Sequence, residues 1–160
     1  MAYSMKTEGL EEFSRMLEQL GDQAEQVAGA SLYEGAAVAA NALNGAIGGV
    51  RTESFRYAPD GRMRLPSPQE KAALERKVGI AKFRKNGSEV DTVIGFGNSG
   101  YTQISGKKKS VAVIARSINS GTSFMQKQPV FRKAARSCKA AVEEAILKKA
   151  DQMIQEMTGG

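Results

Sequence analysis

The feature that most constrains the fold is a long alanine-rich stretch, Asp22–Ile47, in which a few larger apolar residues stand among small ones. These larger residues are Val27, Leu32, Val38, Leu43 and Ile47. Alanine has the highest helix propensity, and small side chains allow a neighbouring helix to come close. The stretch therefore predicts a long helix that packs closely and ends at Gly48 and Gly49.

Amphipathic helices are also predicted near both ends of the chain. From Gly9 onward, apolar residues recur every three or four positions, and Gly21 ends this helix while Asp22 caps the next one. The members of this first stripe are Leu10, Phe13, Leu17 and Leu20. A similar stripe after Pro129 predicts a long C-terminal helix. Its members are Phe131, Ala135, Cys138, Val142, Ile146 and Met153.

The middle of the chain carries local signals of a short helix and a hairpin. Residues 67–70 read Ser-Pro-Gln-Glu, the layout of a capping box with proline at the first helical position, and predict a helix to about Lys77. Apolar residues within 78–83 and 90–96 flank Asn86-Gly87, which predicts two strands joined by a tight turn. The segment 111–118 fits either a third strand or a short helix.

Together these signals predict one α+β domain over residues 1–160. A small antiparallel sheet, built from the hairpin and a third strand if 111–118 is extended, packs with the long N-terminal and C-terminal helices. Residues 51–66 and 98–110 contain Gly, Pro, Ser and charged residues without helical or strand periodicity. We expect both segments to be mobile loops.

Charge is distributed unevenly along the chain. Residues 1–50 hold two Lys or Arg and seven Asp or Glu, a net charge of −5, whereas 51–87 carry +6 and 88–160 carry +5. These values sum to the total of +6. The distribution suits subunits that meet head to tail, and it equally suits nucleic acid as a partner.

Several classes of catalytic and binding site are excluded or weakly supported. The chain has no histidine, which excludes Ser-His and Cys-His nucleophiles, and its single cysteine, Cys138, excludes an internal disulfide or a multi-cysteine zinc site. Ser105 and Lys108 have S-x-x-K spacing, but Lys108 lies in a run of lysines, which does not favour a neutral amine. We therefore expect a protein that is not an enzyme and has no cofactor or metal. A signal peptide and a membrane span are not predicted either.

The segment Gly95–Gly100 matches G-x-G-x-x-G directly after a predicted strand. In dinucleotide-binding folds such glycines precede a helix whose N-terminus contacts pyrophosphate. The residues that follow, 101–106, do not predict a helix, so we interpret the glycines as part of a loop.

Basic residues cluster in two places that are candidates for an interface. One is the start of the C-terminal helix, where the helix dipole disfavours positive charge; it includes Arg132, Lys133 and Arg136. The other is the run Lys107, Lys108 and Lys109. Three explanations stay open: a solvated surface, an acidic neighbouring subunit, or DNA phosphates.

The segment Ser117–Ala135, SINSGTSFMQKQPVFRKAA, resembles the signature of the phage tail-component family typified by gene product ten of a lambdoid siphophage. The matching positions are Gly121, Thr122, Pro129, Phe131, Ala134 and Ala135. The opening Gly9–Phe13 and the alanine-rich helix are similar as well. The chain departs from the family pattern at two places. Asn119 stands where the family has an acidic residue, and residues 73–76 read Ala-Leu-Glu-Arg where the family has Gly-x-Leu-Arg.

The resemblance implies a structural virion protein that completes the tail or joins head and tail, without catalysis. It implies a homo-oligomeric ring and partners among the other neck and tail proteins: tail terminator, tail tube and head-tail connector. The protein would act in the virion, at the tail or neck, after assembly in the host bacterial cytoplasm. The alternative function is a basic nucleic-acid-binding protein, whose affinity for duplex DNA would fall steeply with salt.

Overall fold

The computed structural model describes residues 2–3, 15, 18–54, 61–86, 89–96 and 100–159, and the fold is α+β. The helical elements are η1 (Gly21–Gln23), α2 (Ala24–Gly48), α3 (Pro68–Glu75), α4 (Val111–Ser120), α5 (Val130–Ser137) and α6 (Lys139–Thr158). The strands are β1 (Ala2–Tyr3), β2 (Val78–Ile80), β3 (Arg84–Asn86), β4 (Glu89–Asp91), β5 (Ile94–Phe96), β6 (Tyr101–Ile104) and β7 (Lys107–Ser110). The expected combination of a small sheet with long helices towards both ends is confirmed.

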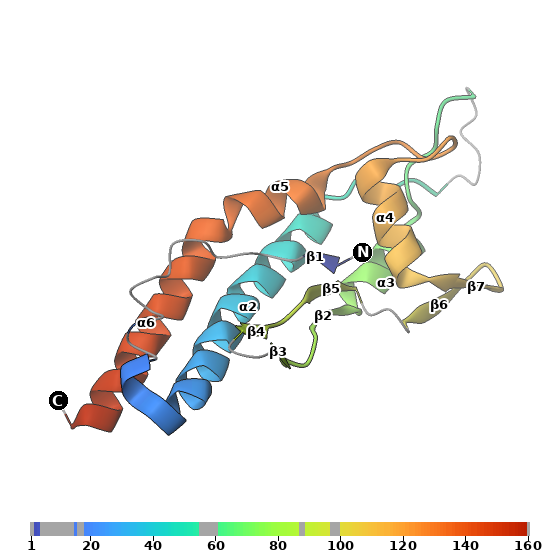
Figure 1. Cartoon of the computed structure of the whole chain (residues 1–160). Helices are drawn as coiled ribbons and strands as arrows, with labels where there is room; N and C mark the ends of the chain where they lie inside the picture. Colours follow the sequence, from blue (N-terminus) through green and yellow to red (C-terminus); the bar gives the residue numbers. More distant parts are fainter. Residues whose placement is uncertain are drawn as a thin grey trace.

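The long helices α2 and α6 lie side by side and form the body of the molecule (Figure 1). The approach is close at Gly35 of α2, where a Cβ atom would lie 2.6 Å from Cγ1 of Ile146 and 3.2 Å from Cγ1 of Val142. The small residues of the alanine-rich stretch thus allow α6 to approach the α2 backbone. The expectation of a closely packed long helix is confirmed.

The ends of α2 agree only partly with the sequence signals. Gly21 has a positive φ of 57° and opens the 3₁₀ turn η1, which also contains Asp22. The N-cap position of α2 falls on Gln23 and has no side-chain hydrogen bond, so the prediction that Asp22 caps this helix is wrong. At the other end, Lys71 Nζ donates to the carbonyl of Gly48, the last residue of α2, and to that of Val50, which follows the helix. Of the first predicted helix, Arg15 and residues 18–20 are helical, and its remaining residues lie outside the described ones.

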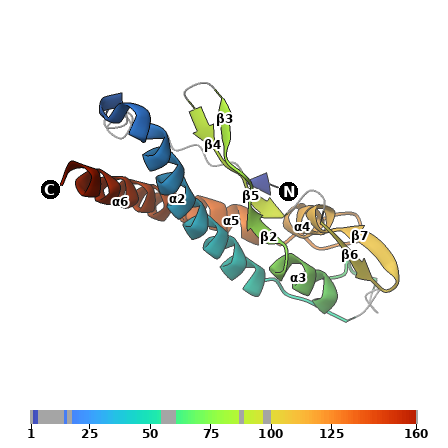
Figure 2. The same ribbon diagram turned by 90° about the horizontal axis from the view of Figure 1, so that it is seen from below.

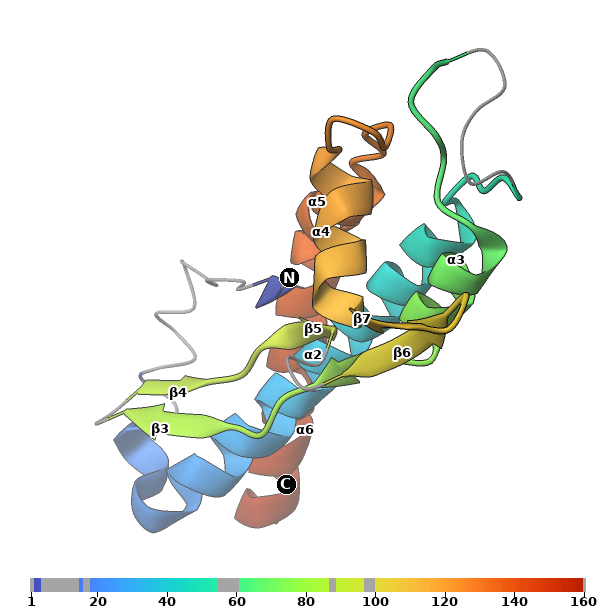
Figure 3. The same cartoon turned by 90° about the vertical axis from the view of Figure 1, so that its right-hand side faces the viewer.

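A hairpin is confirmed in the predicted region, and it consists of two successive ladders. Strand β2 pairs with β5 and β3 pairs with β4, and Ala81 donates to the carbonyl of Val93 between the two ladders. Asn86 belongs to β3 and lies opposite Glu89, so the predicted placement of the turn at Asn86-Gly87 is wrong by one residue. The connection consists of residues 87 and 88, which are outside the described residues. Figure 3 shows α2 between this hairpin and α6.

The third strand of the sheet is not the one we considered. Strand β1 pairs with β5, which gives the order β1-β5-β2. Residues 111–118 instead belong to helix α4, whose buried residues recur at three- and four-residue spacing: Val111, Ile114, Ala115 and Ile118. This helical period explains why a run of β-branched residues there is not a strand.

A second hairpin, β6–β7, occupies most of the segment that we expected to be a loop at 98–110. Ser105 and Gly106 both have positive φ, 51° and 75°, which is the backbone of a tight two-residue hairpin turn. The prediction failed because the lysine run 107–109 obscured the strand, although Tyr101-Thr102-Gln103-Ile104 has β propensity. Since a strand rather than a helix follows Gly100, the glycine pattern does not have the context of a dinucleotide site.

Helix α3 begins with the predicted capping box. Ser67 Oγ accepts from the backbone N–H of Glu70 at 3.2 Å, and Glu70 Oε2 accepts from the backbone N–H of Ser67 at 2.8 Å. The helix ends at Glu75, two residues before the predicted end. Figure 2 shows α3, α4 and the β6–β7 hairpin gathered at the end of α2 opposite to the C-terminus.

The predicted C-terminal helix is divided into α5 and α6 at Cys138. Helical hydrogen bonds continue through this point, from Cys138 to the carbonyl of Ala134 and from Val142 to that of Cys138. Ser137 Oγ donates to the carbonyl of Lys133 at 2.8 Å, and such serine bonds to the preceding turn tend to bend helices. The expected single helix is therefore two helices joined at a bend.

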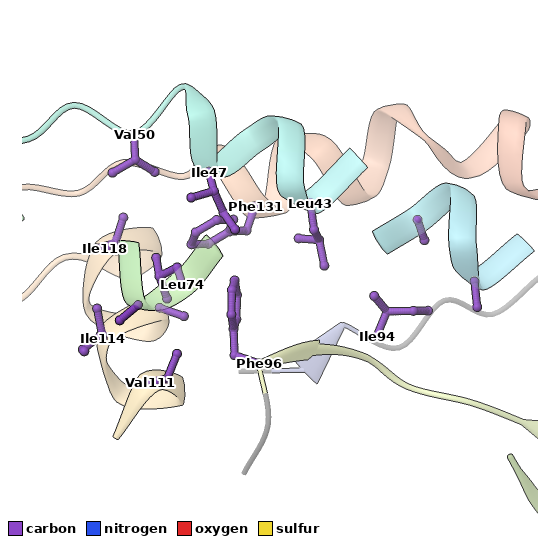
Figure 4. Packing of buried hydrophobic residues seen from close by; sticks show 14 of the residues in the cluster. Leu43, Ile47, Val50, Leu74, Ile94, Phe96, Val111, Ile114, Ile118 and Phe131 are labelled. Atoms are coloured by element: carbon purple, nitrogen blue, oxygen red, sulfur yellow. The ribbon is translucent and has the colours of Figure 1, made fainter. Parts of the chain in front are cut away.

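The core lies where α2, α4, α5 and the sheet meet (Figure 4). Phe131 is fully buried, and its ring contacts that of Phe96 edge to face with centroids 5.3 Å apart. Around them pack Leu43, Ile47, Leu74, Val111 and Ile118.

Among the described helices, none combines the length and apolar character needed to cross a membrane.

The contact at Gly35 generates a stability prediction. We expect Gly35→Ala to lower the free energy of unfolding by ~1–3 kcal/mol, because the new methyl group would overlap Ile146. Gly45→Ala is the control: nothing lies within 4 Å of its Cβ position, so alanine should stabilise α2 by ~0.5–1 kcal/mol. Urea unfolding of both variants and of Gly35→Ala/Ile146→Ala measures the effect. Equal stability changes at the two glycines would contradict the close approach.

Candidate functional site

The candidate site begins at the connection between α4 and α5, where the family-like residues lie. Gly121 ends α4 with φ of 75°, and its N–H donates to the carbonyl of Ser117 at 2.9 Å. A Cβ atom at Gly121 would lie 3.1 Å from Cβ and 3.2 Å from the backbone nitrogen of Lys127. Glycine is thus favoured here for two reasons: the positive φ, and the lack of space for a Cβ atom beside Lys127.

Thr122 closes the turn that follows. Its Oγ1 accepts from the backbone N–H groups of Phe124 and Met125, at 3.3 and 3.0 Å, and its own N–H donates to the carbonyl of Met125. Met125 is buried, whereas Phe124 points into solvent. The hydroxyl of Thr122 therefore fixes which of the two apolar side chains enters the core.

The start of α5 is held by three residues from the same region. Pro129 occupies the N-cap position, and Phe131 anchors the first turn in the core. The buried Asn119 of α4 accepts through Oδ1 from the backbone N–H of Arg132 at 3.2 Å. The amide oxygen of Asn119 supplies a hydrogen-bond acceptor to the start of this helix, as a carboxylate would, so the departure from the family pattern preserves an acceptor.

Gln128 joins this connection to the end of α2, and sequence reasoning missed it. Its buried side chain accepts from the N–H of Arg51 at 2.9 Å and donates to the carbonyl of Arg51 at 3.1 Å. Its backbone N–H donates to the carbonyl of Ile118 at 2.8 Å. A glutamine between a lysine and a proline gives no signal of such a role in the sequence.

The two described ends of the predicted loop 51–66 are also hydrogen-bonded. The backbone N–H of Arg64 donates to the carbonyl of Phe124, and the backbone carbonyl of Arg64 accepts from the N–H of Gln126, both at 2.9 Å, as in a short parallel ladder. Glu53 Oε1 accepts from the N–H of Leu65 at 2.6 Å. Residues 55–60 lie outside the described ones, so the mobility of this loop stays a prediction.

The structure brings Arg132, Lys133 and Arg136 together on the solvent-exposed side of α5. Among the described residues none of these three side chains forms an ion pair, and the first turn of α5 has no acidic residue. Lys139 follows on α6 and lies 3.9 Å from Glu143. Three exposed positive charges on one short helix, two in its first turn and Arg136 in its last, form a surface suited to an anionic partner.

The lysine run 107–109, by contrast, does not form one surface, because side chains alternate along β7. Lys107 is exposed, whereas Lys108 lies over the ring of Tyr101 with Nζ 4.6 Å from the centroid. Lys109 points to the other side, and its Nζ lies 3.2 Å from Oε1 of Glu70. The three lysines thus have three different environments.

Glu70 is the most buried carboxylate of this region, with 2% of its surface exposed. Arg64 donates to both of its oxygens, at 2.9 and 3.1 Å, and Lys109 adds a second cation. Burial alone would raise the pKa of Glu70, but the hydrogen bonds from Arg64 and the Ser67 backbone, the charge of Arg64 and the hydrogen bond from Lys109 outweigh it. They lower its pKa from 4.5 to about 2.

Comparison of the chain with models of protein families, with curated proteins and with solved structures finds no match. The candidate site is therefore defined by geometry: a rigid connection formed around Gly121, Thr122 and Gln128, and the basic surface of α5 that it positions.

The lowered pKa of Glu70 generates a prediction about acid stability. A carboxyl group with a folded-state pKa of about 2 stabilises the fold above its usual pKa of 4.5 and loses this contribution as the pH falls towards 2. The difference corresponds to roughly 3 kcal/mol. We expect the unfolding free energy of the wild type to fall over this range, and that of Glu70→Gln, which keeps the cap acceptor, to start lower and change less.

Glu75→Gln on the exposed side of the same helix is the matched control for this pH series. It removes the same charge without touching the Arg64 and Lys109 contacts, so its acid profile should follow the wild type. Parallel profiles of wild type and Glu70→Gln in chemical denaturation between about pH 2 and 6 would show that the ion cluster contributes no net stability.

The conformation and the crowding of Gly121 generate a further prediction. Gly106 has the same φ of 75° but nothing within 4 Å of its Cβ position, whereas Gly121 combines this φ with a ψ of 167°, a region essentially restricted to glycine, and is crowded by Lys127. We expect Gly106→Ala to destabilise the fold by ~1–2 kcal/mol through backbone strain, and Gly121→Ala by ~1–3 kcal/mol more, because its backbone conformation is more restricted and Lys127 must move. Thermal unfolding of the two variants tests this, and equal losses would contradict it.

Proposed function

We propose that this chain is a structural virion protein of a tailed bacteriophage, a tail-completion or head-tail joining subunit that acts by binding and not by catalysis. The observation that carries the proposal is the arrangement of the family-like residues. Gly121 and Thr122 form the turn, Pro129 begins α5, and Phe131 anchors it in the core. The residues that resemble the family signature thus act together to position the exposed basic helix α5.

The charge of the chain supports assembly with protein partners. The surface of α5 carries Arg132, Lys133 and Arg136, while residues 1–50 carry a net charge of −5. An acidic surface on one subunit and a basic surface on the next allow a head-to-tail contact that closes into a ring. The proposed partners are further copies of the chain and other neck and tail proteins: tail terminator, tail tube and head-tail connector. The proposed location is the tail or neck of the virion, after assembly in the host bacterial cytoplasm.

The proposal is tested by deleting the gene from the phage genome that carries it and supplying variants from a plasmid. We expect the deletion to give separate heads and tails in electron micrographs, and the wild-type gene to restore joined particles. The triple variant Arg132→Glu, Lys133→Glu and Arg136→Glu should restore at most about 1% of the infectious particles, because three reversed charges oppose binding of an acidic surface.

The design separates loss of binding from loss of folding. Acidic residues are favoured near the start of a helix by ~0.3–1 kcal/mol each and disfavoured by a similar amount in its last turn, so reversal at Arg132 and Lys133 should more than offset that at Arg136 in the stability of α5. The control variant reverses Arg76, Lys77 and Lys82, which are exposed and lie outside α5, and should complement as the wild type does. Normal joined particles without the gene would exclude the proposed function.

The same three charges, which form no ion pair with any residue that the structure describes, support one alternative, a nucleic-acid-binding protein. If this were the function, the affinity for duplex DNA would fall by orders of magnitude between about 50 and 200 mM salt through counterion release. Light scattering of the purified chain with and without DNA at both salt concentrations distinguishes the two. A ring-sized oligomer, or a monomer that ignores DNA, supports assembly, and salt-sensitive DNA complexes support the alternative.

A further inference from the structure

A second surface, distinct from α5, is hollowed to a volume of about 890 Å³. Its walls come from residues 61–64, the start of α3, the β6–β7 hairpin and residues 123–124. Figure 3 shows the β6–β7 hairpin beside α3, with the connections before α3 and after α4 extending from the same end of the molecule. The volume lies in the range of sites that hold a small ligand or a few residues of a peptide.

The lining of the hollow has more positive than negative charge. Arg64 and Lys109 share one carboxylate, that of the buried Glu70. Lys107 is exposed at the rim and forms no ion pair with any residue that the structure describes. Since Ile104 and Lys107 face each other across the hairpin, as do Thr102 and Lys109, this side of the hairpin presents both basic and apolar groups to the hollow.

Two large apolar side chains are exposed at the same hollow. Phe124 has 60% and Met63 47% of its surface exposed. Both are carried by segments that hydrogen-bond to each other through Arg64 and Gln126, so their positions are set before any partner arrives. Phenylalanine, methionine and arginine are enriched in protein interfaces, and a preformed position reduces the entropy lost on binding.

We propose that this hollow binds a short acidic and apolar segment of a partner protein. Carboxylates of the segment would lie near Lys107 and Lys109, and an apolar side chain would contact Phe124 and Met63. A phosphate backbone would satisfy the lysines but would leave both apolar side chains in water, which favours a protein segment over nucleic acid. The inference concerns a different surface from α5 and does not depend on the proposed function.

The test uses the full-length chain and two fluorescent peptides, EDLEFED and its polar counterpart EDSESED. We expect saturable binding of the first with a dissociation constant in the micromolar range and at least about tenfold weaker binding of the second. The double variant Lys107→Glu/Phe124→Ser should weaken binding of the first peptide by about tenfold or more. Both side chains are exposed, so the fold should be unaffected, which the amide NMR spectrum checks.

The matched control is Lys108→Glu/Val113→Ser. Lys108 is the next residue of the same strand but lies over the ring of Tyr101, and Val113 on α4 is 61% exposed; neither residue lines the hollow. This variant should bind within about twofold of the wild type. Three results would overturn the proposal: no saturable binding below about 1 mM, an equal loss in the control, or duplex DNA that displaces the peptide and is itself lost on Lys107→Glu/Phe124→Ser.

Discussion

The close approach of α6 to α2 at Gly35 sets the positions of most other elements. Helix α2 contacts α3, α5, α6 and the β2–β5 hairpin, so each of them is placed by its distance from that one helix. Only small residues on one side of α2 allow α6 to lie so near, since a Cβ atom added at Gly35 would come within 2.6 Å of Ile146. Helix α5 also packs against α2 and carries Phe131 into the core.

The parts of the fold that the sequence predicts correctly depend on residues near one another in the chain. The capping box needs Ser67 and Glu70 only three positions apart, and the β2–β5 hairpin needs apolar strands on either side of one turn. The long helix α2 follows from alanine propensity over its own length. The β6–β7 hairpin is local too, and its turn at Ser105 and Gly106 was a usable signal that the neighbouring lysines outweighed.

The parts that the sequence does not predict depend on contacts between distant residues. Strand β1, near the first residue of the chain, pairs with β5, so that Ala2 lies opposite Gly95. The side chain of Gln128 hydrogen-bonds to Arg51, 77 positions earlier. For the basic residues of α5, by contrast, their spacing in the sequence is enough to predict that they cluster. Nothing in the lysine run 107–109 could reveal that Lys109 forms an ion pair with Glu70, because the pairing requires α3 and the β6–β7 hairpin to lie side by side.

The pairing of α2 with α6 has a consequence for the newly made chain. Helix α6 leaves the ribosome only after residues 49–138 have been added, which takes about 5–20 s at ~5–20 residues per second. During that interval the surface of α2 around Gly35 lacks its final covering by Val142 and Ile146. A small-residue surface exposes little apolar area per turn, so the feature that permits close packing in the folded state also limits aggregation while the partner helix is still being synthesised.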